Sequence, residues 1–308
     1  MNKSTKLLLF INPKARNSTS IKELQLISNL LKENNLDHSI ETSMYLGHAK
    51  ELLSDLKYQG YNFLIIGGDG TLNNFIQNWQ LIENRILGII PVGSGNDFAK
   101  NLGYSKNLKK DLVQLLTSII EESITHVNTG EIELWEQGTE SSRVFQFINS
   151  VGIGFDAKVA YLNNTQKVLP GIFNYILSVL KAVKSLTPFK TSVVIDSLKF
   201  ETNAVLITCG NGKTSGGGFY LTPNAKIEDD LLDFTIIKPI SKLRLLKELP
   251  KALINTLYKV PEVSFHTGTK IELYLDSPVY VHADGEILSE KCIKILVKLN
   301  KRKIKVYY

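Results

Sequence analysis

The sequence predicts a two-domain α+β protein, in which an N-terminal α/β domain is followed by a C-terminal antiparallel β-sandwich domain. Up to about residue 125, short apolar runs alternate strictly with helix-like segments, which indicates βαβ units and a mainly parallel sheet. From about Val127 the runs become short and alternating, and Gly, Pro, Asn and Asp separate them, as in antiparallel sheets. The length of 308 residues leaves room for two domains of common size.

In the first domain the strands are the compact apolar runs, expected at Lys6–Ile11, Ser39–Ser43, Tyr61–Ile66 and Ile86–Pro91. The segments between them have helical periodicity, with helices expected at Ile21–Asn34, Ala49–Gln59 and Leu72–Leu81. This domain should span residues 1–127.

In the second domain, residues 128–290, strands are expected at Gly130–Trp135, Val144–Asn149, Ser192–Ile195, Ala204–Cys209, Leu232–Ile237, Ile271–Leu275 and Val279–Ala283. Two helices interrupt them, at Gly171–Leu186 and through Leu243–Lys259. The apolar alternation around Lys291–Lys305 predicts final strands, so a segment of about 291–308 should return to the first domain.

Composition excludes several classes of protein. Apolar residues make up 43% and charged residues 21%, and no apolar run approaches the ~18 residues of a membrane-spanning helix. Two cysteines and five scattered histidines give no disulfide framework and no Cys/His metal cluster, which favours a cytoplasmic location. The net charge of +6 is uneven, because 157–195 carries +5 without an acid and 287–308 carries +6. Such local charge suggests an anionic partner, but the basic segments lack the interleaved aromatics expected for nucleic acid.

Two glycine-rich turns are the strongest functional signal. The predicted strand Tyr61–Ile66 runs into Gly67–Thr71 and a helix, and Ile86–Ile90 runs into Pro91–Phe98 and a helix. Glycines let a backbone approach a phosphate, and free N–H groups at a helix start favour negative charge. A tight turn capped by Asp69 also explains the first loop when it is taken alone. Two such loops at the carboxyl edge of one parallel sheet predict a nucleotide and metal site.

These turns resemble the diacylglycerol and sphingosine kinase superfamily, and most closely its soluble bacterial lipid kinases. Gly67–Thr71 is similar to the GGDGT signature, Gly93–Phe98 to the P-x-G-(T/S)-x-N-D-F loop, and Asn12–Arg16 to the N-P-x-(S/A)-(G/R) turn. Further similarity covers Asn149–Ala157, Asn211–Ala225 and Asp284–Glu286. GGDGT is shared with NAD kinases, whereas the ordered set is specific.

The resemblance implies an NAD-kinase-like, phosphofructokinase-like first domain and an ATP- and Mg²⁺-dependent kinase that phosphorylates the hydroxyl of a lipid alcohol such as diacylglycerol. It implies that Asp69 and Asp97 organise Mg²⁺ and that Glu286 is the general base. The residues it places at ATP are Asn12, Pro13, Lys14, Ala15, Arg16, Ser43, Gly68, Asp69, Gly70, Thr71, Leu72, Asn73, Asn74 and Ser94. It places a second, structural Mg²⁺ at Lys226, Asp229 and Leu231, partly through main-chain carbonyls.

Three positions depart from the family pattern. Asn74 stands where Glu is common, Asn128 where a third acidic residue is usual, and Asp230 where Gly is usual. Asp69, Asp97 and Glu286 are all present, so activity is expected. An NAD kinase-like enzyme and a catalytically weak lipid- or nucleotide-binding module remain alternatives. Without the family, Asp284-Gly285 is a hairpin turn signal.

The helix expected at Gly171–Leu186 has one narrow polar stripe, formed by Asn174, Ser178, Lys181 and Ser185. Its wide apolar remainder fits a helix buried between layers. It also fits a helix that lines a lipid entry or docks on a bilayer, with Lys181 and Lys184 at its side. The second interpretation predicts transient, peripheral membrane association. The sequence leaves a homodimer open.

Overall fold

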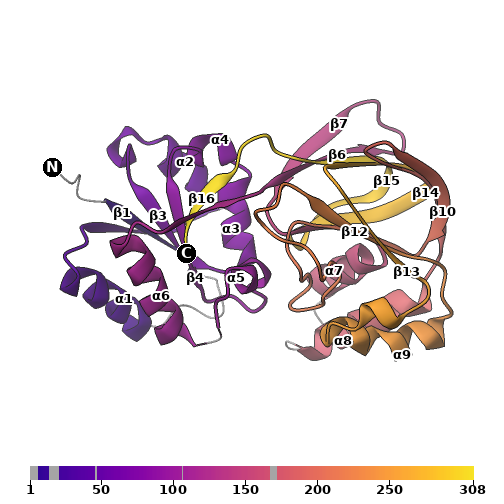
Figure 1. Cartoon of the computed structure of the whole chain (residues 1–308), viewed down its shortest axis with the longest axis horizontal. Coiled ribbons are helices and arrows are strands. Elements are labelled where there is room, and N and C mark those ends of the chain that lie inside the picture. The colour runs from indigo at the N-terminus through magenta and orange to yellow at the C-terminus, as the bar shows by residue number, and fades with distance from the viewer. Residues whose placement is uncertain (1–5, 14–20, 46, 106, 167–171) are drawn as a thin grey trace. The chain divides into compact units, whose positions relative to one another are not determined.

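The computed structural model describes residues 6–13, 21–45, 47–105, 107–166 and 172–308 (Figure 1). The chain divides into two compact units, one running to Asn128 and completed by Lys301–Tyr308, the other formed by Thr129–Asn300. The segment that returns to the first unit therefore begins about ten residues later than the sequence indicates. The reason is that the strand β15 (Glu286–Leu299) stays paired within the second unit almost to its end.

The first unit contains a six-stranded sheet in the order β2-β1-β3-β4-β16-β5. Its strands are β1 (Leu7–Ile11), β2 (His38–Thr42), β3 (Asn62–Gly67), β4 (Ile86–Pro91), β5 (Ile124–Val127) and β16 (Ile304–Tyr307). All neighbouring pairs are parallel except β16 and β5, so the predicted mainly parallel sheet is confirmed. The carboxyl ends of β3 and β4 lie next to one another in this order, where both glycine turns begin.

Short helices connect these strands: α1 (Ile21–Glu33), α2 (His48–Ser54), η2 (Leu56–Tyr58), α3 (Asp69–Ile76), α4 (Trp79–Ile82), α5 (Asp97–Asn101) and α6 (Leu108–Ile120). The helix expected at Ala49–Gln59 is broken at Asp55, which is extended and accepts the backbone N–H of Lys57 with its side chain. α6 was not predicted. Its residues Leu112 and Leu115 pack with α1 against buried side chains of β1, β3 and β4.

The second unit is an antiparallel β-sandwich, as predicted. Its strands are β6 (Gly130–Glu136), β7 (Ser142–Phe147), β8 (Ser150–Gly154), β9 (Phe189–Ile195), β10 (Leu198–Ala204), β11 (Leu206–Gly210), β12 (Leu232–Ile237), β13 (Val263–Gly268), β14 (Lys270–Ala283) and β15. The first half of β14 pairs with β9 and its second half with β8, so this strand joins both parts of the sheet. The separate strands expected at Ile271–Leu275 and Val279–Ala283 are therefore one strand with an irregular register.

Three helices and a short turn accompany the sandwich: α7 (Phe155–Thr165), α8 (Ile172–Lys184), α9 (Lys242–Leu253) and η3 (Leu257–Lys259). α7 was not predicted. α8 contacts both α7 and α9, and Figure 1 shows α8 and α9 along the same edge of this unit. None of the described helices combines the length and apolar character needed to cross a membrane.

Candidate active site

The two glycine turns of the first unit touch through their backbones. Val92 donates its N–H to the carbonyl of Gly67 at 3.0 Å, which continues the β3–β4 pairing into the turns. A Cβ atom on Gly93 would lie only 2.5 Å from the Cα of Gly68 and 2.6 Å from Oδ1 of Asn96. Glycine is thus required at this point for steric reasons, because no side chain fits between the two turns.

Asn96 holds the second turn in shape. Its backbone is left-handed at φ 51°, a conformation that Asn tolerates better than most residues. Its Oδ1 accepts the N–H of Gly93 at 3.0 Å, and its Nδ2 donates to the carbonyl of Gly93 at 2.9 Å. This local ring of hydrogen bonds leads directly into α5 at Asp97.

The two carboxylates expected at Mg²⁺ both belong to residues at the start of α5 or in contact with it. Oδ1 of Asp69 accepts the N–H of Phe98 at 3.3 Å, so the Asp69 side chain reaches the residue beside Asp97. Asp97 is only 6% exposed and pairs with Lys100 at 2.8 Å. Among the described residues, no cluster of three or more His, Cys, Asp or Glu side chains is arranged to hold a metal. Two adjacent carboxylates nevertheless suit a Mg²⁺ that takes its remaining oxygens from water and phosphate.

Other residues expected at ATP fall around the same strand ends. Asn12 follows β1, and its Nδ2 donates to Oγ1 of Thr71 at 2.9 Å. Ser43 follows β2 and donates its N–H to the carbonyl of Ile11 at 2.7 Å. The more exposed members of the expected set are Pro13, Gly70 and Ser94, those partly exposed are Gly68 and Asn74, and Leu72 and Asn73 are buried. Lys14, Ala15 and Arg16 lie outside the described residues.

In the second unit, Asp284 and Gly285 form the turn between β14 and β15. Both have positive φ, at 48° and 85°, and Ala283 pairs with Glu286, so this is the predicted two-residue hairpin of type I′. The Asp284 carboxylate accepts three backbone N–H groups, from Ile148, Asn149 and Ser150, each at 2.9 Å. These bonds fix the turn to the β7–β8 connection. Glu286 follows as an exposed residue at the start of β15.

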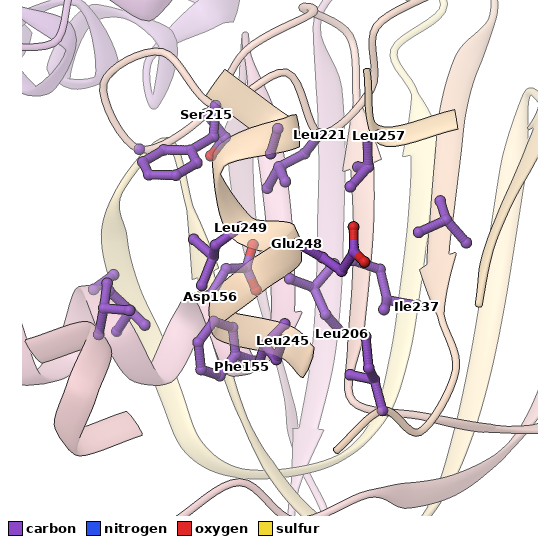
Figure 2. A pocket seen from close by; sticks show the side chains of 18 of the residues that line it. Phe155, Asp156, Leu206, Ser215, Leu221, Ile237, Leu245, Glu248, Leu249 and Leu257 are labelled. Carbon is purple, nitrogen blue, oxygen red and sulfur yellow. The ribbon is translucent and has the colours of Figure 1, made fainter. Parts of the chain in front are cut away.

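An apolar pocket lies in the second unit, close to this turn. α7 and α8 contribute Val159 and Val179 to its lining. α9 contributes Leu245 and Leu249, which Figure 2 shows beside Phe155 and Asp156. Strands β11 and β12 supply Leu206 and Ile237. The polar groups among its lining residues include Asp156, Ser215, His282 and Gly285. The pocket therefore reaches the residue that precedes Glu286.

The buried His282 and the partly buried Asp156 form a pair in this lining, which the sequence analysis missed. Nε2 of His282 lies 3.4 Å from Oδ2 of Asp156, and Nδ1 accepts the N–H of Gly285 at 3.3 Å. His282 is 3% exposed. A Cβ atom on Gly152 would lie 2.1 Å from Oδ2 of Asp156 and 2.3 Å from Nε2 of His282. Gly152 thus makes room for the pair, and only the strand pairing between β8 and β14 reveals that relationship.

The expected structural metal site lies in the turn before β12. Oδ1 of Asp229 accepts the N–H of Leu231 at 3.1 Å, and Asp230 takes the left-handed backbone at φ 62°. The turn therefore keeps a left-handed conformation that suits Gly, although this chain has Asp230 where the family pattern has Gly. Burial, and then the nearby charge of Asp229, raise the pKa of Asp233 to about 6, while Lys226 opposes the shift. Asp233 is a nearby acid that the sequence analysis did not select.

Two family models match the chain. One, for the diacylglycerol kinase catalytic domain, covers residues 6–132. The other, for the YegS C-terminal NAD kinase beta sandwich-like domain, covers residues 149–306, which is more than half of the chain. Together they account for both units.

Curated relatives match over most of their length. The "Probable lipid kinase YegS" of Salmonella newport is 26% identical over 290 residues, which is 92% of this chain and 89% of the relative. The "Probable lipid kinase YegS-like" protein of Klebsiella pneumoniae is 26% identical over 299 residues, covering 94% and 91%.

Solved structures share the fold. A diacylglycerol kinase from Bacillus anthracis superposes with a TM-score of 0.73 at 22% identity, covering 100% of this chain and 98% of that one. A yeast NADH kinase in complex with NADH gives a TM-score of 0.56 at 12% identity, with 99% and 84% covered. At these identities the likeness concerns the fold alone.

Proposed function

Because the chain belongs to the family of YegS-like lipid kinases, whose first domain is a diacylglycerol kinase catalytic domain, we propose that it transfers the γ-phosphate of ATP to the hydroxyl of a lipid alcohol such as diacylglycerol. The observation that carries the proposal is the apolar pocket of the second unit. Its lining includes Gly285, so an alkyl chain in the pocket would leave a polar headgroup beside the turn that bears Glu286.

ATP is the proposed phosphoryl donor. The touching turns at Gly68 and Gly93 expose backbone at the ends of two parallel strands, and α3 begins directly after Gly68. The N-cap residue of α3 is Gly68, which has no side chain to cap the helix, so the first N–H groups of α3 suit phosphate oxygens. Phosphoryl transfer depends mainly on positioning and on neutralising charge, which is what such turns supply.

Mg²⁺ is the proposed cofactor, held by Asp69 and Asp97. Asp97 begins α5 and the Asp69 carboxylate accepts the N–H of Phe98 in the same helix, and hard oxygen ligands suit this cation. When bound, Mg²⁺ would neutralise charge on the transferred phosphate. Asp97 also forms an ion pair with Lys100. A second Mg²⁺ is proposed at Asp229 and the main chain around Lys226 and Leu231, where Asp233 adds a neighbouring buried acid.

Glu286 is the proposed general base. A base must reach the proton of the acceptor hydroxyl, and Glu286 is exposed on a turn that Asp284 fixes with three hydrogen bonds. Its carboxylate would take the proton as the hydroxyl oxygen attacks the γ-phosphorus and ADP leaves. The type I′ turn and its hydrogen bonds to Asp284 hold the backbone next to Glu286 against the β7–β8 connection.

The proposal is tested by incubating the purified chain with γ-labelled ATP, Mg²⁺ and separate acceptors: diacylglycerol, monoacylglycerol, a sphingoid base and NAD. Label in a lipid phosphate is the expected result. Label in NADP alone would replace the proposal with an NAD kinase activity. Binding of ATP without label in any acceptor would favour the binding-module alternative.

A further inference from the structure

α8 buries the apolar residues Val179, Ala182 and Val183, but it also exposes a second set of apolar side chains and buries two polar residues. Asn174 and Ser178, at 4% and 2% exposed, are buried, whereas Phe173, Ile176 and Leu180 are 63%, 49% and 48% exposed. The interpretation of this helix as buried between layers is therefore wrong. In an ordinary surface helix the apolar stripe faces the core. In α8, two residues of the polar stripe, Asn174 and Ser178, are buried as well. Nδ2 of Asn174 donates to Oδ1 of Asn163 on α7 at 2.9 Å.

α9 and the residues after it also carry exposed apolar side chains. Leu243, Leu253 and Ile254 are 83%, 50% and 68% exposed, and Tyr258 in η3 is 64% exposed. The same helix buries Leu245 and Ala252 against the unit. α8 and α9 touch, and Nζ of Lys242 donates to the carbonyl of Lys184 at 2.6 Å, which ties the two helices together. We call their exposed apolar residues the docking face: Phe173, Ile176, Leu180, Leu243, Leu253, Ile254 and Tyr258.

The charge around the docking face is mainly positive. Exposed lysines accompany it on both helices, at Lys184, Lys242, Lys247 and Lys259. α8 has no acidic residue, and the two acids near α9 are already neutralised: Glu248 pairs with Lys251 and Glu262 pairs with Arg244. Apolar side chains surrounded by lysines match the interface of an anionic bilayer, where alkyl groups enter the headgroup region and lysines meet lipid phosphates.

The apolar pocket lies on the inner side of the same two helices. Tyr175 and Val179 of α8, and Leu245, Leu249 and Ala252 of α9, line the pocket with their inner sides. The same two helices thus separate the pocket from the surface that carries exposed alkyl and aromatic groups. A substrate with acyl chains has to leave a bilayer to enter such a pocket, and these helices are the elements next to it.

We propose that α8 and α9 dock this protein on the surface of an anionic lipid bilayer through the docking face, next to the pocket that takes the acceptor lipid. The role of the pocket rests on the proposed function, whereas the docking itself does not. A second copy of the chain fits less well, because two identical lysine-rich faces would repel each other.

The test is flotation of the full chain with vesicles of phosphatidylcholine alone and of phosphatidylcholine mixed with phosphatidylglycerol. The wild type should float with the mixed vesicles and lose this binding as salt is raised. The apolar variant Leu180→Glu with Leu243→Glu, and the charge variant Lys184→Glu with Lys247→Glu, should each weaken partitioning by about tenfold or more. The matched control, Leu198→Glu with Lys199→Glu on exposed positions of β10, should bind as the wild type does.

Kinase assays separate this proposal from the proposed function. The docking-face variants should phosphorylate a short-chain acceptor in detergent as the wild type does, and should lose activity on vesicles. Equal flotation of all variants would overturn the docking. So would a wild-type dimer that the same substitutions dissociate without any vesicle binding. Vesicle binding by a protein that phosphorylates no acceptor would support the docking and overturn the proposed function.

Discussion

The backbones of Gly68 and Gly93 are in direct contact, and a Cβ atom on Gly93 would lie 2.5 Å from the Cα of Gly68. The obstacle is backbone, which cannot rotate away as a flexible side chain could. The two turns proposed to hold the phosphates of ATP are therefore held at a fixed separation by the absence of side chains. Any side chain at Gly93 must separate the turns or distort one of them.

The variant Gly93→Ala is expected to lose ATP binding, which calorimetry would measure. Its free energy of unfolding should fall by about 1–3 kcal/mol, as overpacking does. Gly138→Ala is the matched control, because Gly138 has a positive φ but nothing within 4 Å of its Cβ position. It should cost only the backbone strain, about 1 kcal/mol, and bind ATP normally. Normal ATP affinity in Gly93→Ala would show that the contact between the turns does not shape the nucleotide site.

Glu286→Gln tests the general base. The exposed side chain makes a drop in folding stability unexpected, and turnover should fall by roughly 10²–10⁴-fold because the proton of the acceptor hydroxyl loses its acceptor. The measurements are kcat with a lipid acceptor, ATP affinity, and the midpoint of urea unfolding. Near-normal turnover in the folded variant would remove Glu286 from the mechanism.

Asp284→Asn tests the residue that holds the turn in place. Unlike Glu286, Asp284 is expected to contribute to folding stability. An amide can keep one oxygen for two of the three N–H donors, but its NH₂ group then faces the third, the N–H of Ile148. Losing charge-assisted hydrogen bonds should lower the free energy of unfolding by about 1.5–3 kcal/mol. Turnover should fall as well, because the turn that carries Glu286 loosens. Unchanged urea unfolding would contradict the anchoring role.

The part of the site that could be predicted from the sequence is the part fixed by local backbone chemistry. Glycine or a turn residue is required at set positions in Gly67–Thr71, Pro91–Phe98 and Asp284-Gly285. The conformation of these segments can therefore be predicted from the sequence. α7 was missed because its segment follows Gly154 without the capping residue or apolar period that marks a helix start. The sequence leaves open whether the wide apolar face of α8 is buried or exposed, since the burial of Asn174 depends on Asn163 of another helix. The pair of Asp156 with His282 depends on strand register across 126 positions in the same way.

Removal of the proposed structural Mg²⁺ should destabilise the protein. Asp229 and the buried Asp233 lie close enough for one charge to raise the pKa of the other, so a bound cation relieves their repulsion. Mg²⁺ at about a hundred times its Kd would add about 2.7 kcal/mol to the free energy of unfolding. Asp229→Asn should abolish the rise in Tm on adding Mg²⁺. Glu228→Gln, a change at the preceding residue, should leave this rise in Tm unchanged. An equal rise in both variants would place the cation elsewhere.

His266 gives an expected pH dependence of stability. It lies on β13, stacked on Phe200 with ring centroids 5.4 Å apart, and burial lowers its pKa below the ordinary value. The folded state then binds the proton less readily than the unfolded state does. The stability linked to this group is complete above the pKa of the unfolded chain and is lost as pH falls through the lower pKa of the folded protein.

The measurement is the midpoint of urea unfolding between neutral and mildly acidic pH for the wild type, His266→Gln and His266→Phe. Both replacements remove the titrating ring, so both should lose less stability than the wild type as the solution is acidified. Comparing the two replacements separates the effect of proton binding from the effect of stacking on Phe200, because only the Phe replacement keeps the stacking. Parallel pH curves for all three proteins would mean that proton binding at His266 does not differ between the folded and unfolded states.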